Sequence, residues 1–125
     1  MTILRCAILD DYQHAALTAA EWLTLGGQVE VRAIHHHLRT DQEVASEIGD
    51  CQIVVAMRER TPFPAALFER LRHLQLLVTT GMRNPAIDLQ AADAHGVVVC
   101  GTLGLLYLTK MLSVFRARGF VTRFS

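Results

Sequence analysis

The segment from Leu74 to Thr102 restricts the fold more than any other part of the chain. It begins with an apolar run, Leu76 to Val78, and continues through a polar loop into a stretch rich in small residues, Ala86 to Ala94, which predicts a helix. Gly96 then ends the helix, and Val97 to Cys100 begins a second apolar run. A strand–helix–strand unit this short fits only a right-handed crossover between parallel strands. Its first loop should therefore lie at the carboxyl edge of a parallel sheet, where such sheets bind ligands.

The rest of the chain repeats this alternation. Two nearly continuous apolar runs, Ile3–Leu9 and Cys51–Met57, predict strands buried on both faces. A third run, Gln28–Ile34, alternates apolar and polar residues and predicts an outer strand. Three further helices are expected: Ala15–Leu23, a helix capped by Thr40 or Asp41 with Glu43 placed for a capping box, and a helix from Thr61-Pro62 to Leu74. The predicted fold class is α/β, a flavodoxin-like three-layer sandwich with a five-stranded parallel sheet in the order 2-1-3-4-5.

Composition excludes several classes of protein. The chain has 125 residues, 51% of them apolar, which suits one ordered domain with a real core. Its net charge is zero, so bulk electrostatics predicts neither a nucleic-acid partner nor a membrane surface. No secretory signal and no membrane-spanning run is visible, and we expect a cytoplasmic protein. Cys6, Cys51 and Cys100 lie far apart, so we expect reduced, mostly buried thiols and no metal site.

The last part of the chain differs in composition from the rest. Residues 103–125 contain four basic residues and no acidic residue, whereas all twelve acidic residues precede them. We therefore expect a domain over residues 1–102 and a divergent C-terminal helix and tail over residues 103–125. An apolar stripe from Leu105 to Phe115 predicts a helix that its own sheet or a second subunit must cover, so we expect a homodimer.

Polar residues follow each of the inner strands, at the point where the strand ends. They form four clusters: Asp10-Asp11-Tyr12, Met57 to Thr61, Thr79 to Asn84, and Gly101-Thr102. If the strands are parallel, all four clusters converge on one edge of the sheet. An acidic pair after the first strand also occurs in phosphorylated receiver domains of this fold. The sequence argues against that function, because Arg58 stands where the phosphoacceptor aspartate is needed.

The segment from Leu74 to Thr102 also resembles a known protein family. The residues that carry the resemblance are Gly81, Asn84, Ile87-Asp88-Leu89, Ala91-Ala92 and Gly96-Val97-Val98. They resemble the N-terminal substrate-binding domain of NAD-dependent, D-isomer-specific 2-hydroxyacid dehydrogenases, the family that includes D-3-phosphoglycerate dehydrogenase. The resemblance extends back to Met1 and is lost after Thr102. It implies an oxidoreductase that acts on the CH–OH group of D-2-hydroxy acids.

The resemblance also implies substrate-binding residues. Arg58 and Thr61 are similar to an Arg-Ser-x-Thr segment in phosphoglycerate-type relatives, with Glu59 in place of the serine, and there the arginine lies near the acidic group of the substrate. An arginine fork also matches a carboxylate in its own right. Gly81 and Met82 correspond to a loop that binds the substrate carboxylate through main-chain amides, although this loop is two residues longer than the commonest spacing. The alternatives are a surface arginine paired with an acid and an ordinary turn.

Other features predict no chemistry of their own. His35-His36-His37 is interpreted as a solvated loop, because neighbours on an extended chain point to alternating faces and rarely share one metal ion. No G-x-G-x-x-G motif follows a strand, since Gly101-Thr102-Leu103-Gly104 lacks its spacing. NAD, the cofactor of the full-length family, is therefore not expected to bind this chain, and no catalytic residue is predicted in it.

The sequence thus predicts a substrate-binding domain that binds a small 2-hydroxy or 2-oxo acid. We expect it to lack the Rossmann domain and to be inactive alone. It would come from a truncated gene or a short paralogue. The alternative is a non-catalytic ligand-sensing or interaction module of the same fold. The sequence does not indicate which 2-hydroxy acid is bound.

Overall fold

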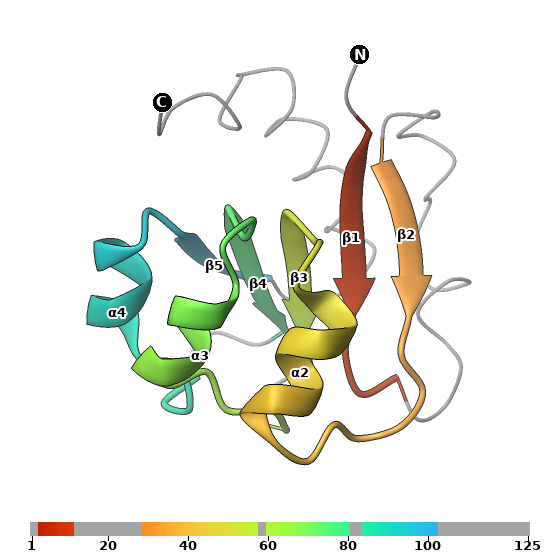
Figure 1. The fold of residues 1–125 in the computed structure, drawn as a ribbon, viewed down its shortest axis with the longest axis horizontal. Coiled ribbons are helices and arrows are strands. Elements are labelled where there is room, and N and C mark those ends of the chain that lie inside the picture. Colours follow the sequence, from red (N-terminus) through yellow and green to blue (C-terminus); the bar gives the residue numbers. More distant parts are fainter. Residues whose placement is uncertain (1–2, 12–28, 58–59, 81–83, 103–125) are drawn as a thin grey trace.

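The computed structural model describes residues 3–11, 29–57, 60–80 and 84–102. Within them, five parallel strands form one sheet in the order β2-β1-β3-β4-β5, which confirms the predicted class and strand order. In Figure 1 the sheet runs from β5 on the left to β2 on the right, with the arrowheads of the strands at one edge. The strands are β1 (Leu4–Ile8), β2 (Val29–Ala33), β3 (Ile53–Ala56), β4 (Leu76–Thr80) and β5 (Val98–Thr102).

The burial of each strand follows its sequence pattern. All four residues of β3 are buried, as is every residue of β4 except Thr80. β2 alternates in exposure, as an outer strand should, because its polar residues Glu30 and Arg32 are exposed. The runs predicted for β1 and β2 were two residues longer than the strands, and the run predicted for β3 was three residues longer. β4 and β5 instead continue two residues past their apolar runs, to Thr80 and Thr102.

Three helices cover one face of the sheet, as Figure 1 shows: α2 (Asp41–Ile48), α3 (Ala65–Arg70) and α4 (Leu89–Ala94). Thr40 caps α2 by accepting a hydrogen bond from the amide of Glu43, which confirms the first half of the predicted capping box. The Glu43 carboxylate reaches the amide of Arg39 rather than that of Thr40. The box therefore closes one residue earlier than expected.

Successive residues of the inner strands point to opposite faces of the sheet, so the hydrophobic core consists of two clusters, one on each face. Ala7, Val54 and Leu77 pack with the helices in one cluster, which also contains buried residues of α2, α3 and α4. Their neighbours along the strands, including Cys6, Ile53 and Leu76, form a second cluster on the opposite face. Both clusters are buried, as expected for a parallel sheet.

The start of α3 differs from the prediction. A helix was expected from Thr61-Pro62 to Leu74, but α3 begins at Ala65 with Pro64 as its N-cap and ends at Arg70. Phe63 precedes Pro64, and a residue before proline avoids the helical conformation. Phe63 instead forms a parallel bridge with Ile87, in which the Phe63 amide donates to Ala86 and the Asp88 amide donates to Phe63.

The helix predicted from Ala86 also starts later, at Leu89. Asp88 is its N-cap and accepts a hydrogen bond from the Ala91 amide. Gly96, which was expected to end this helix, has φ 72, a left-handed conformation that glycine adopts without strain.

Other expectations fall outside the described residues. The predicted helix Ala15–Leu23 and the tail, residues 103–125, lie there, and with them the expected dimer surface. Within the described part of the chain, no helix is long and apolar enough to cross a membrane. Cys6 and Cys51 are free thiols and are buried, and Cys100 is partly buried. For Cys6 and Cys51 this agrees with the expectation of reduced, buried thiols.

Candidate functional site

The carboxyl edge of the sheet brings together the polar residues that follow the strands. β3 pairs with β1 on one side and with β4 on the other, so the loops after these strands leave the sheet side by side. Ala56 is in register with Thr79, which places the ends of β3 and β4 next to each other. The predicted convergence is therefore seen for the described residues of these loops. They form two groups, one around Asp10 and one beside β4 and β5.

Asp10 is the centre of the first group. Its side chain is 1% exposed, and its backbone has φ 58, which aspartate tolerates better than most residues. One carboxylate oxygen lies 2.9 Å from Nδ1 of His37, and the other accepts a hydrogen bond of 2.5 Å from the hydroxyl of Thr61. The main-chain oxygen of Asp10 accepts a bond of 2.9 Å from Arg60. We call Asp10, His37, Arg60 and Thr61 the Asp10 cluster.

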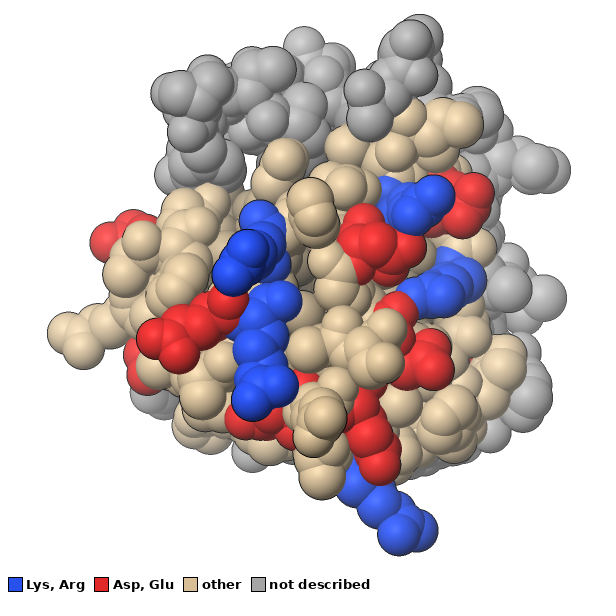
Figure 2. All heavy atoms as spheres, viewed as in Figure 1, with Lys and Arg blue, Asp and Glu red and all other residues tan. Residues whose placement is uncertain are grey.

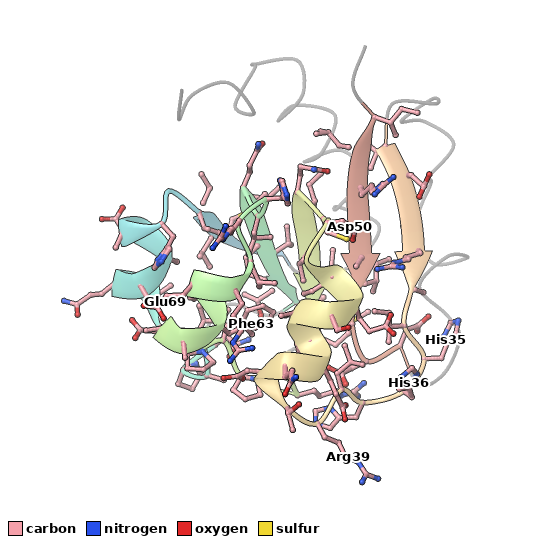
Figure 3. The ribbon with its side chains drawn as sticks, in the orientation of Figure 1. His35, His36, Arg39, Asp50, Phe63 and Glu69 are labelled. Carbon is pink, nitrogen blue, oxygen red and sulfur yellow. The ribbon has the colours of Figure 1, made fainter. Side chains whose placement is uncertain are left out.

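The histidine segment lies beside this cluster. Figure 3 shows His35 and His36 just beyond the arrowhead of β2. Nδ1 of His35 lies 3.0 Å from the main-chain oxygen of Asp11 and 3.5 Å from its carboxylate. His36 and His37 are exposed, as a solvated loop predicts, but the sequence did not reveal that His35 and His37 contact the acidic pair. The described residues contain no group of three metal-ligating side chains.

The predicted substrate-binding residues are only partly described. Arg58, Gly81 and Met82 lie outside the described residues, although their flanking residues fix where the loops begin and end. Thr61 is described: it is 2% exposed, and its hydroxyl is bonded to Asp10. The Thr61 side chain therefore points into the protein, and its bond to Asp10 joins the loop after β3 to the end of β1.

A cleft of about 620 Å³ lies beside the ends of β4 and β5. Its described lining is mainly apolar and consists of Thr79, Asn84, Pro85, Ile87, Leu89, Val99, Cys100 and Gly101. The Asn84 side-chain amide donates to the Thr79 hydroxyl at 3.0 Å, and its oxygen accepts from the Ala86 amide at 3.0 Å. Asn84 thereby ties the loop after β4 back to its strand.

The two groups meet between β3 and β4. The Thr80 hydroxyl lies 3.9 Å from the sulfur of Met57, the residue that begins the loop after β3. Behind them, the bridge between Phe63 and Ile87 joins the two loops a second time. Figure 3 shows Phe63 in the layer of the helices, close to α3. Sequence patterns did not predict this bridge, which holds the loops after β3 and β4 next to each other.

The thiols are poorly suited to nucleophilic chemistry. Burial raises the pKa of the Cys6 thiol, with Cys51 adding to the effect, and burial raises the pKa of the Cys51 thiol to about 11. Burial also raises the pKa of Cys100, which lines the cleft. A raised pKa leaves little reactive thiolate at neutral pH.

The amino edge carries a charge cluster of a different kind. Arg5 donates to the Asp50 carboxylate at 2.7 Å, and Arg32 lies 3.8 Å from it, around a hollow of about 200 Å³. Desolvation of Asp50 opposes ionisation, but the Arg5 hydrogen bond, a main-chain hydrogen bond and the charges of Arg5 and Arg32 together outweigh it, so the pKa of that carboxyl lies below its usual value. Both arginines are occupied by acceptors of this cluster, since Arg32 also bonds to the main-chain oxygen of Glu47. On the face in Figure 2, acidic and basic side chains are intermixed.

Comparison with known proteins identifies the family. Residues 6–107 match the family described as D-isomer specific 2-hydroxyacid dehydrogenase, catalytic domain. The chain belongs to this family. The match covers most of the chain and continues five residues past Thr102, where the resemblance was expected to end. Comparison with curated proteins gave no match.

Solved structures show the same relationship. A protein from Ralstonia solanacearum assigned as a D-3-phosphoglycerate dehydrogenase is 32% identical, with a TM-score of 0.72 over 79% of this chain. A phosphoglycerate oxidoreductase from Vibrio cholerae is 25% identical, with a TM-score of 0.73 over 82% of this chain. A 3-phosphoglycerate dehydrogenase from Entamoeba histolytica with bound NAD+ shares the fold at 15% identity, with a TM-score of 0.67 over 81% of this chain. The chain spans 30%, 32% and 33% of these three proteins.

Members of this family bind NAD, but the described residues do not suit a dinucleotide. Pyrophosphate binds at helix N-termini that offer free main-chain amides. Here the side chain of Thr40 accepts from the Glu43 amide at the start of α2, and that of Asp88 accepts from the Ala91 amide at the start of α4. α3 follows Pro64, which has no amide proton. The loop after β1 presents two buried acidic residues. These features disfavour a pyrophosphate site at the described helix starts and at the described residues after β1.

Proposed function

We propose that this chain is the substrate-binding part of an NAD-dependent dehydrogenase that acts on the CH–OH group of a D-2-hydroxy acid. In this proposal the carboxylate of a small 2-hydroxy or 2-oxo acid binds at the carboxyl edge, between the loops after β3 and β4. Arg58 supplies a charged fork, and main-chain amides at Gly81 and Met82 supply further donors. Thr61 acts from inside the loop, through its bond to Asp10.

The observation that carries the proposal is the adjacency of the two loops. The register of β3 with β4, the Thr80–Met57 contact and the Phe63–Ile87 bridge hold them next to each other at the ligand-binding edge of a parallel sheet. The family match covers both loops. A cleft of about 620 Å³ beside the second loop leaves room for the rest of a small acid.

Hydride transfer is assigned to a complete dehydrogenase and not to these residues alone. NAD would supply the hydride acceptor, and this chain's residues would bind and orient the acid. A domain that carries NAD would have to face the same edge, because the hydroxyl-bearing carbon lies next to the bound carboxylate. We accordingly propose that the isolated chain neither binds NAD nor oxidises 2-hydroxy acids.

The test compares an acid with a neutral molecule of similar size. D-Glycerate should bind the 125-residue chain with a dissociation constant on the order of millimolar, as expected for half of a binding site, whereas glycerol should not bind. Arg58→Gln should weaken D-glycerate binding, and the exposed arginine Arg39→Gln should serve as the matched control. Equal affinity of wild type and Arg58→Gln would contradict the assigned role of Arg58. Saturable micromolar binding of NADH would contradict the proposed need for a second domain.

Two further proposals concern the setting of the protein. The two buried free cysteines, Cys6 and Cys51, favour a reducing compartment, and we propose a cytoplasmic location. We also propose a homodimer through the predicted tail helix. Leu106 and Val114 do not lie on the apolar stripe predicted between Leu105 and Phe115, so they would be exposed on a monomer. Sedimentation of the chain and of a Leu106→Glu, Val114→Glu variant tests the dimer. A monomeric wild type would end that proposal.

A further inference from the structure

We propose that the Asp10 carboxylate is a positioning group that holds the loop after β3 in its ligand-binding geometry. The inference rests on the function proposed above, in which Arg58 of this loop binds the substrate carboxylate. Asp10 itself lies at the end of β1 and is 1% exposed, so it acts through its protein contacts rather than by touching a ligand.

Two of the contacts made by Asp10 reach consecutive residues of the loop. Its carboxylate accepts the Thr61 hydroxyl at 2.5 Å, and its main-chain oxygen accepts Arg60 at 2.9 Å. The Arg60 amide also donates to the Met57 oxygen at 3.3 Å, so the described residues on the two sides of this loop are bonded to each other. Arg60 and Thr61 in turn anchor the loop on the end of β1.

A third contact brings in the loop after β2. The second oxygen of the Asp10 carboxylate lies 2.9 Å from Nδ1 of His37. A carboxylate in this position joins three neighbouring loops, which follow β1, β2 and β3. The left-handed backbone of Asp10, with φ 58, helps to direct its main-chain oxygen to Arg60 while its side chain meets Thr61 and His37.

These contacts have a consequence for binding. Burial of a carboxylate is costly unless it is hydrogen-bonded, so moving the Thr61 hydroxyl away from Asp10 would remove a bond that stabilises this buried group. Arg60 and Thr61 are consequently restrained before any ligand arrives, and a preorganised site loses less freedom on binding. Small displacements of a charged fork from its partner weaken binding sharply. Loss of the Asp10 contacts should thus lower the affinity for a carboxylate ligand.

The test uses the full 125-residue chain with variants that retain shape. Asp10→Asn keeps the size and the tolerance for a left-handed backbone but removes the charge. Thr61→Val removes the donor, and Thr61→Ser restores it. Asp93→Asn, at an exposed position on α4, is the control. D-Glycerate affinity and hydrogen exchange of the Arg60 amide are measured where every variant remains more than about 99% folded, so that partial unfolding cannot account for a difference.

We expect Asp10→Asn and Thr61→Val to bind D-glycerate roughly tenfold more weakly, the loss typical for one hydrogen bond to a charged group. The Arg60 amide should exchange faster in both, while Thr61→Ser and Asp93→Asn resemble the wild type. A purely structural role would lower the urea midpoint but leave the affinity of the folded variants unchanged, and that result would overturn the inference.

The two proposals fail in different ways. If the wild type does not bind D-glycerate, the proposed function fails. The exchange of the Arg60 amide then decides the positioning inference separately. Faster exchange in Asp10→Asn would support Asp10 as the group that holds this loop, and unchanged exchange would overturn it.

Discussion

Replacement of Phe63 by alanine should destabilise the protein strongly. Phe63 is completely buried between the loops after β3 and β4, and its ring centroid lies 6.1 Å from that of Phe68 in α3. Truncation removes the buried ring and leaves a cavity, which in protein cores costs about 3–5 kcal/mol. The total stability of a small domain is about 5–15 kcal/mol, so this loss is a large part of it.

The control for this variant is Leu89→Ala. Leu89 is also a large apolar residue, and it lies near the bridge partner of Phe63, but it is 61% exposed. Its truncation should change the free energy of unfolding by no more than about 0.5 kcal/mol. Urea denaturation followed by circular dichroism measures both variants, and equal slopes of the two transitions would show that the folded states are comparable.

The amide protons of Phe63 and Asp88 give a second measurement of the same feature. Both donate to main-chain oxygens across the bridge, so both should be protected from exchange in the wild type and less protected in Phe63→Ala. A loss of less than about 1 kcal/mol in Phe63→Ala, with the two amides unprotected in the wild type, would refute the role of Phe63 in joining the loops.

Three further predictions concern single positions. Asp88→Ala removes the N-cap of α4 and should cost about 1 kcal/mol in urea denaturation, whereas Asp93→Ala in the same helix should cost much less; equal losses would contradict the cap. Gly96→Ala forces a left-handed conformation on alanine and should cost roughly 1–2 kcal/mol, and a neutral effect would show that φ is not positive there. The pKa of Cys51 is about 11 in the folded chain against an ordinary 9.0, so unfolding releases a proton and stability falls as pH rises from about 9 to 11. Urea midpoints of wild type and Cys51→Ala over this range should converge with rising pH, and a constant difference would contradict the raised pKa.

The sequence predicted those features that depend on local patterns. Continuous apolar runs identified β1 and β3 as inner strands, and alternation in Glu30 to Arg32 identified β2 as an outer strand. Thr40 was one of two candidate helix caps, with Asp41, and its spacing to Glu43 fitted a capping box; Gly96 was recognised as a helix stop. Each of these features depends on residues that lie within a few positions of one another, so it can be predicted from one sequence.

Features that depend on distant residues were missed. Nothing near Phe63 in the sequence indicates that Ile87 will pair with it, and without that bridge a proline-started helix is the natural expectation from Thr61-Pro62. The contacts of Asp10 join residues 27 to 51 positions apart. Asp10-Asp11 was singled out as polar at the correct edge, but its role in holding Thr61 required the register of the strands. The candidate ligands Arg58, Gly81 and Met82 remain predictions.

The measurement that most directly tests the account is the location of a bound carboxylate. Titration of the 15N-labelled chain with D-glycerate should shift amides around the carboxyl edge, among them Met57, Arg60 and Asn84. Residues of the amino-edge charge cluster, Arg5 and Asp50, should remain unchanged. Shifts confined to Arg5, Asp50 and their neighbours, with none at Met57 to Thr61 or at Thr79 to Asn84, would contradict the central claim that this domain binds its substrate acid between the loops after β3 and β4.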